Sequence, residues 1–287
     1  AGYALAGLAG LFDSFWGVAL FWFVGATASA AVIPLLDVVA LRRARAEGFD
    51  FSWPRGFGSA AFVVANVAMG ALLLIAPENA VIVWIVAGSL GLAVAAWAWL
   101  PHERVAPPGA DADAPAASFR ARYGGLGRVL RDRLFLTAIL ASGSIQAAHG
   151  FYYGFSALLW KGQGVSESVI GQLWAVAVAA EIAFLWWGAP WLRRRGVGAV
   201  GLLVLGGAAA LARWGVLALA PPLALLWPLQ ALHALTFAAT YLAGVDLVQR
   251  LAPPDAHTAG QVLNSTLSAG VLIGLATLAS GPLYDAV

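Results

Sequence analysis

Four ionisable side chains lie deep inside long apolar segments of this sequence. They are His149, Glu181, Arg213 and His233. An ionisable group at membrane depth usually faces a cavity or a partner, and such groups form ion and proton pathways. Histidine changes charge near neutral pH, and a desolvated carboxylic acid stays neutral until a cation approaches it. These residue types can therefore take up, pass on and release protons.

Each of the four also has a simpler explanation. Arg213 lies about two turns from one end of its segment, so its long side chain could extend to the surface instead of pointing inward. Glu181 could be a neutral acid that is hydrogen-bonded between helices, and single histidines are often packing residues.

Two segments present polar and aromatic side chains at helical spacing. In the first, Gln146, His149, Tyr153 and Trp160 recur at intervals of three, four and seven residues, with Tyr152 beside them. Residues at such intervals share one face of a helix. The second segment repeats the pattern with Gln230, His233, Phe237, Thr240, Tyr241 and Gly244. We expect both faces to line a cavity, although hydrogen bonding between helices would need the same residues.

The segments that carry these residues have the composition of membrane spans. Of 287 residues, 61% are hydrophobic and 10% are charged, whereas about a quarter of the residues in a soluble domain are charged. The apolar residues form blocks of roughly 20, the length of a helix that crosses a bilayer. This pattern excludes a soluble enzyme, a disordered chain, a coiled coil and a β-barrel. It predicts an all-α, polytopic membrane bundle.

Turn residues divide the chain into one truncated span, at about 1–12, and eight complete ones. The complete spans are 15–41, 57–76, 79–100, 134–158, 168–190, 197–219, 222–246 and 259–280. The longest polar stretch, 101–133, is predicted to be a cytoplasmic central loop. It separates residues 1–100, part of an N-terminal bundle, from residues 134–287, a C-terminal bundle that lacks its last helix.

The positive charges fall on one side of these spans. Fourteen arginines lie on that side, Lys161 lies alone on the other, and Arg213 lies within a span. Because cytoplasmic loops carry the excess of positive charge, the arginine-rich loops should face the cytoplasm. The preference for arginine over lysine suggests a GC-rich bacterial genome.

Several kinds of site are missing from the sequence. There is no cysteine, no metal-binding histidine pair with an acid, no nucleophile elbow and no phosphate-binding loop. We therefore expect no enzymatic activity, no cofactor, no metal site and no nucleic-acid partner.

Several runs match the helices of a known family. They are Pro34–Asp37 with Leu41 and Arg42; Arg55 with Gly58, Ser59 and Phe62; Gln146–Tyr153 with Phe155 and Ser156; Ile170–Glu181; His233–Ala238; and Gly281–Asp285. They resemble the fourth, fifth, seventh, eighth, tenth and eleventh helices of the major facilitator superfamily, in its phenylpropionate-permease-like group of proton symporters. The resemblance implies two pseudo-symmetric helical halves, of which this sequence covers about helices three (in part) to eleven of twelve.

The resemblance also implies a function and a set of site residues. Glu181, Arg213 and His233 are similar to the acid, arginine and histidine of sugar–proton symporters, which carry a second glutamate where Thr236 stands. The implied protein is a monomeric secondary transporter of the bacterial inner membrane that takes up a small aromatic carboxylate with protons by alternating access. The expected substrate contacts are Gln146, His149, Tyr152, Tyr153, Gln230, Phe237 and Tyr241.

Alternatives remain open at this point. The same fold could serve a sugar or nucleoside symporter or a drug exporter, and a helical bundle could have a structural or receptor role without transport. Arg213 could discharge Glu181 or bind a substrate carboxylate. Because the ninth helix of this fold is more peripheral to the cavity, the resemblance favours the first role.

Overall fold

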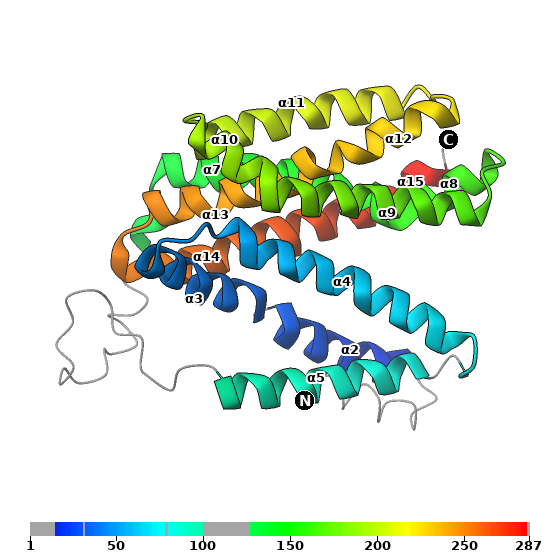
Figure 1. Cartoon of the computed structure of the whole chain (residues 1–287), viewed down its shortest axis with the longest axis horizontal. Helices are drawn as coiled ribbons and strands as arrows, with labels where there is room; N and C mark the ends of the chain where they lie inside the picture. The colour runs from blue at the N-terminus through cyan, green and yellow to red at the C-terminus, as the bar shows by residue number, and fades with distance from the viewer. Residues whose placement is uncertain (1–14, 31, 78–79, 100–126, 286–287) are drawn as a thin grey trace. The chain divides into compact units, whose positions relative to one another are not determined.

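The computed structural model describes residues 15–30, 32–77, 80–99 and 127–285, and every regular element within these ranges is a helix. Figure 1 shows their order. The α-helices are α2 (Phe15–Ala30), α3 (Val32–Glu47), α4 (Ser52–Leu73), α5 (Ala80–Trp99), α7 (Arg133–Ala147), α8 (His149–Gly162), α9 (Glu167–Ala183), α10 (Ala189–Arg194), α11 (Ala199–Leu217), α12 (Leu223–Ala231), α13 (Thr240–Leu251), α14 (His257–Ser265) and α15 (Ile273–Asp285). Three π-helical segments, η2 (Phe184–Gly188), η3 (Ala234–Ala239) and η5 (Thr266–Leu272), and a short 3₁₀ turn, η4 (Pro254–Ala256), join some of them.

Seven helices in the described ranges are long and apolar enough to cross a membrane by length and composition. They are Ser52–Leu73, Ala80–Trp99, Arg133–Gly162, Glu167–Arg194, Ala199–Leu217, Leu223–Leu251 and His257–Tyr284. The prediction of an all-α membrane bundle is thus confirmed. The outward faces of these helices are apolar, as lipid requires. In α5, for example, no residue is buried.

Three of the predictions involve residues that are not described. The span 15–41 is present as α2 and α3, and Ala31 between them is not described. Pro34 lies in the first turn of α3, where its missing N–H breaks no helical hydrogen bond. The truncated span at 1–12 and most of the central loop 101–133 lie outside the described residues.

The chain divides into two compact units, which are described separately. One unit comprises Ala1–Asp37 and Phe62–Ala114, and the other comprises Val38–Ala61 and Pro115–Val287. The first therefore holds α2, α5 and the adjoining parts of α3 and α4. The second holds the remaining parts of α3 and α4 and all helices from α7 onward. The predicted division into bundles around residues 101–133 stays a prediction.

The second unit is built around α11, α12 and α13. In this unit α11 packs against η3 and α13, α9 packs against α12, and α7 packs against α13. Gly206 of α11 allows the close approach, because a Cβ atom there would meet the Thr240 hydroxyl and lie 3.1 Å from the Leu235 carbonyl oxygen. Gly206 and Arg213 both belong to the buried face of α11. Their helix therefore directs Arg213 toward the residues around η3.

Two composite helices are distorted where they carry ionisable residues. Glu181 lies near the end of α9, just before η2, and His233 directly precedes η3. A π-helical turn inserts an extra residue into the helical repeat and rotates the side chains that follow it. Pro228 in α12 adds a second irregularity, because it cannot donate a backbone hydrogen bond. The directions of these side chains therefore depart from ideal helical spacing.

Candidate functional site

Arg213 is the largest fully buried side chain of the described residues. Its side chain therefore does not extend to the surface. Nη1 donates to the Thr236 hydroxyl at 3.1 Å, and Nη2 donates to Gln230 Oε1 at 3.1 Å. The guanidinium also lies over two aromatic rings, 4.6 Å from the centroid of Tyr152 and 4.5 Å from that of Trp214. Ring faces attract cations, particularly where water is excluded.

In the part of the chain that the structure describes, Arg213 has no carboxylate partner. Among the described residues, no ion pair joins Arg213 to an acidic side chain, and its Nε atom is buried without a hydrogen-bond partner. A buried charge normally has a hydrogen-bonded partner of opposite charge. Within the described ranges, Arg213 is therefore held by neutral acceptors and aromatic rings.

His233 lies between Arg213 and Glu181. Its Nδ1 atom is 3.2 Å from Arg213 Nη1, and its Nε2 atom is 3.6 Å from Glu181 Oε2. Because a guanidinium can only donate, Nδ1 must accept this hydrogen bond, and the proton of the neutral ring is then on Nε2. The direct contact expected between Arg213 and Glu181 is replaced by one in which His233 presents its N–H to the carboxylate.

Glu181 is surrounded by donors. It is 5% exposed, and the Ser59 hydroxyl of α4 donates to its Oε1 atom at 2.7 Å. His233 faces the other oxygen. Ser59 and His233 therefore face the two oxygens of one buried carboxyl group. The surroundings of this carboxyl group change if either neighbour moves away.

His149 occupies the other side of Arg213. Its Nδ1 atom is 3.1 Å from the carbonyl oxygen of Gln146, which can only accept. The ring proton is therefore on Nδ1, and Nε2 accepts from the Thr236 hydroxyl at 3.1 Å and faces Arg213 Nη1 at 3.4 Å. A second positive charge at His149 would directly face the guanidinium. His149 is therefore suited to be a neutral acceptor. It belongs to the buried network that Arg213, His233 and Glu181 form with their contacts.

The two polar stripes predicted from spacing do face each other. The Tyr152 hydroxyl donates to Gln230 Oε1 at 2.7 Å, and Gln146 Nε2 donates to the Phe237 carbonyl at 3.2 Å. The rings of His149 and His233 are 5.3 Å apart. In this arrangement the stripes bond largely to one another. Their role as a cavity lining stays a prediction.

Helix irregularity changes which tyrosine enters the network. Spacing placed Tyr153 on the polar stripe and Tyr152 beside it. In the structure Tyr152 is 3% exposed and Tyr153 is 42% exposed. The reason is that α7 ends at Ala147 and α8 begins at His149, which interrupts the regular repeat between Gln146 and the tyrosines. Tyr153 still stacks on His149, with ring centroids 5.5 Å apart.

Two predicted site residues, Phe237 and Tyr241, form a row of stacked rings with His233. The ring of Phe237 stacks on His233 at 5.1 Å, and the ring of Tyr241 lies 6.4 Å beyond it. Tyr241 is covered by the guanidinium of Arg55, at 4.7 Å. Tyr241 thus lies with Arg55 rather than with Arg213.

Some members of the network were not predicted as site residues. Ser59 is a small polar residue next to a glycine, a pattern that also occurs in ordinary helix packing. Thr236 was noted only as a departure from the sugar symporters, yet its hydroxyl contacts both His149 and Arg213. Trp214 directly follows Arg213, and nothing in its position predicted that its ring would lie beneath the guanidinium.

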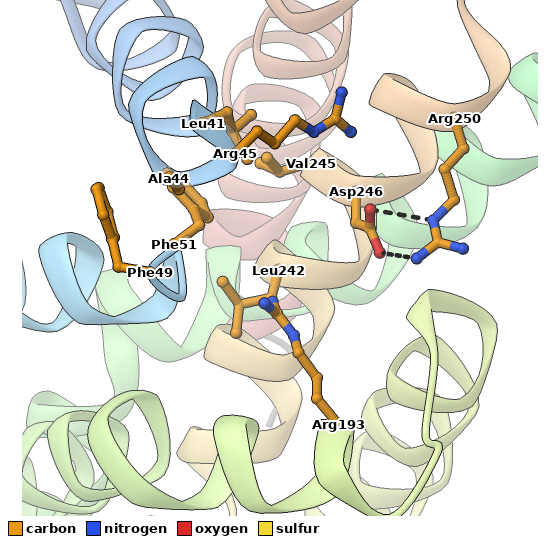
Figure 2. A pocket seen from close by; sticks show the side chains of 10 residues that line it. All are labelled: Leu41, Ala44, Arg45, Phe49, Phe51, Arg193, Leu242, Val245, Asp246 and Arg250. Atoms are coloured by element: carbon orange, nitrogen blue, oxygen red, sulfur yellow. Dashed lines mark hydrogen bonds and ion pairs between the residues drawn. The ribbon is translucent and has the colours of Figure 1, made fainter. Parts of the chain in front are cut away.

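A separate pocket of about 200 Å³ lies at the helix ends that carry arginines (Figure 2). It is lined by Leu41, Ala44, Arg45, Phe49, Phe51, Arg193, Leu242, Val245, Asp246 and Arg250. Asp246 and Arg250 form a bidentate pair at 3.1 and 2.9 Å. Arg193 pairs at 2.8 Å with Asp50, in the turn between α3 and α4. None of the predicted substrate-binding or proton-coupling residues lines this pocket.

Comparison with known proteins identifies relatives along most of the chain. The sequence model of the MFS_1 like family matches residues 4–287. The chain is 27% identical over 254 residues to the "Probable 3-phenylpropionic acid transporter" of Escherichia coli (strain K12), covering 88% of this chain and 64% of that protein. It is 29% identical over 283 residues to the "Maltose permease" of Geobacillus stearothermophilus, covering 99% of this chain and 67% of that protein.

A third relative is named as a transporter without a substrate. The "Uncharacterized transporter YwbF" of Bacillus subtilis (strain 168) is 22% identical over 259 residues, covering 90% of this chain and 61% of that protein. The chain thus spans roughly two thirds of the length of these relatives, and less than two thirds of the first. No solved structure matches it at a comparable level. The relatives are named as transporters or permeases and not as enzymes.

Proposed function

Since the chain belongs to the MFS_1 like family, we propose that it works in the proton-coupled uptake of a small organic acid by alternating access. The observation that carries the proposal is the continuous line of buried polar contacts from Arg213 through His233 to Glu181. A bundle with only a structural role would not need three ionisable groups in contact at membrane depth.

Proton coupling is supported by the surroundings of Glu181. The carboxyl group is buried, and Ser59 and His233 face its two oxygen atoms. If the helices that carry these donors move apart, desolvation favours the protonated acid, and if they return, the carboxylate is favoured again. Alternating access provides such movements. Glu181 would thus bind a proton in one conformation and release it in another.

The substrate class is supported by Arg213. A buried guanidinium without a carboxylate can bind one through two parallel hydrogen bonds, and the rings of Tyr152 and Trp214 beside it suit an aromatic substrate. The E. coli relative is named for an aromatic carboxylic acid. A second candidate is a sugar, which the name of the maltose permease favours.

Uptake by the complete gene product tests this proposal. Cells that produce it should accumulate labelled 3-phenylpropionate, more at acidic than at neutral external pH, and a protonophore should abolish the accumulation. Cells with the empty vector serve as the control. Accumulation of maltose but not of the acid would transfer the proposal to the sugar. Accumulation of either compound that persists with the protonophore would contradict proton coupling.

We further propose that the protein is a monomer in the bacterial plasma membrane, with its arginine-rich loops in the cytoplasm. Because the sequence has no cysteine, single introduced cysteines report their side of the membrane directly. Lys161→Cys should react with a membrane-impermeant maleimide in intact cells, and Arg194→Cys only after the cells are opened. Both positions are exposed. Labelling of Lys161→Cys only in opened cells would reverse the orientation.

A further inference from the structure

Ser59 reaches the buried carboxyl group from a helix far away in sequence. Its hydroxyl donates to Glu181 Oε1 at 2.7 Å across a separation of 122 residues. The buried residues of α4 are Ser52, Gly56 and Ser59, which share one face, whereas the remainder of the helix is exposed or half-buried. Ser59 is therefore buried because this face of α4 packs against the helix of Glu181.

Close packing around Trp186 brings the two helices together. Trp186 lies in η2, five residues after Glu181, and its Nε1 atom donates to the carbonyl oxygen of Trp53 at 3.4 Å. Its ring lies 5.2 Å from that of Phe57. A Cβ atom at Gly56 would collide with the indole. The first two turns of α4 thus fit around Trp186, and this fit brings Ser59 within hydrogen-bond distance of Glu181.

The Ser59 hydroxyl has a second acceptor within its own helix. The carbonyl oxygen of Arg55 lies 3.5 Å from Ser59 Oγ, in the arrangement that serine commonly adopts inside helices. If Glu181 is protonated or moves away, Ser59 can donate to this carbonyl and lose little. The two partners therefore differ. Ser59 keeps an acceptor when the contact is lost, whereas a carboxylate at Glu181 loses a charge-assisted hydrogen bond and has one donor fewer.

We propose that Ser59 is a positioning residue that makes proton release from Glu181 depend on the contact between α4 and α9. This proposal rests on the proposed function, in which Glu181 carries the coupled proton. When the two helices are in contact, Ser59 stabilises the carboxylate and the proton leaves. When they separate, Ser59 returns to the Arg55 carbonyl and Glu181 takes up a proton.

Other charged or titratable groups near Glu181 do not make its proton release depend on the contact between α4 and α9. His233 faces it from the segment between α12 and η3, and Tyr153 of α8 interacts with it electrostatically. Arg213 of α11 lies beyond His233. All three belong to the same part of the chain as Glu181, after the stretch 100–126. Among the described residues, only Ser59 contributes a hydrogen bond to Glu181 from α4.

Ser59→Ala should change the pH dependence of uptake. Without the donor the carboxylate is less stable, so Glu181 keeps its proton to higher pH. The external pH at which uptake falls to half should therefore rise by about one unit, the shift expected for one hydrogen bond to a charged group. Ser59→Cys, with a weaker donor, should give a smaller rise, and Ser59→Thr, which keeps the hydroxyl, should restore the original midpoint.

Ser52→Ala is the matched control. Ser52 lies on the same buried face of α4, but its hydroxyl has no hydrogen-bond partner, so the same substitution there should leave the pH midpoint unchanged. The amount of each variant in the membrane is measured by immunoblot. An unchanged midpoint in both Ser59→Ala and Ser59→Cys would overturn the proposal, and so would an equal rise in Ser52→Ala.

Glu181→Gln, measured in parallel, separates this proposal from the proposed function. If Glu181→Gln still accumulates substrate against a gradient, proton coupling at Glu181 is wrong, and the role of Ser59 is wrong with it. If Glu181→Gln is uncoupled but Ser59→Ala keeps the original midpoint, only the role of Ser59 is wrong. The double variant Ser59→Ala with Glu181→Gln should exchange substrate at the same rate as Glu181→Gln alone.

Discussion

Glu181→Gln should abolish accumulation of substrate against a gradient and leave downhill exchange largely intact. Each coupled proton allows about a tenfold accumulation per unit of pH gradient, and the variant should fall to a ratio of about one. The glutamine amide has the shape of the protonated acid but has no proton to release. Its carbonyl can accept from His233, and its amino group can donate to Ser59, which then donates to the Arg55 carbonyl. The network should therefore stay folded.

The measurement is the ratio of internal to external labelled substrate in energised vesicles, beside exchange under equal concentrations. Glu167→Gln provides the matched control, since Glu167 is exposed and pairs with Lys161 at 2.6 Å. It should accumulate substrate as the unmodified protein does. Unchanged accumulation and pH response in Glu181→Gln would make Glu181 a packing acid.

Arg213→Lys should raise the substrate concentration for half-maximal uptake at least tenfold and preserve accumulation at saturating substrate. Lysine keeps the positive charge near His233 but cannot reproduce the planar, two-point contact of a guanidinium with a carboxylate. Arg213→Gln removes the charge as well and should abolish both tight binding and coupling. The comparison thus separates the two roles open to this residue, namely substrate binding and support of Glu181 through His233.

Labelled uptake over a range of substrate concentrations gives both quantities. Arg43→Lys serves as the control, because Arg43 is exposed and its pair with Glu47, at 2.8 Å, tolerates either cation. If Arg213→Lys binds substrate normally but no longer accumulates it, Arg213 does not bind the carboxylate and supports coupling only. If it behaves as the unmodified protein, neither role is correct.

Local sequence properties were sufficient for the fold class and for most spans. Hydropathy depends on composition within about 20 residues, so seven of the eight complete spans have counterparts among the membrane-competent helices. The same property identified His149, Glu181, Arg213 and His233, since an ionisable residue within an apolar block is visible without any tertiary information. Helical spacing also selected two polar faces, and these lie against each other.

Only the tertiary structure decided which of these side chains touch. Spacing cannot show how far a helix is rotated about its axis, and irregular turns change that rotation. The interruption at Ala148 buries Tyr152 rather than Tyr153, and the π-helical segments follow Glu181 and His233 closely.

The contacts of Glu181 likewise separate what the sequence indicates from what only the tertiary structure decides. The sequence indicated that a buried acid and a buried arginine are present, but it favoured their direct contact. Close packing at Gly206 brings α11 to η3, where His233 lies between the two charges, and close packing at Gly56 brings Ser59 to the carboxyl group. Residue types and membrane depth are local properties that the sequence alone determines. Contacts between helices more than 100 residues apart depend on how their surfaces fit, and that fit exists only in the folded chain.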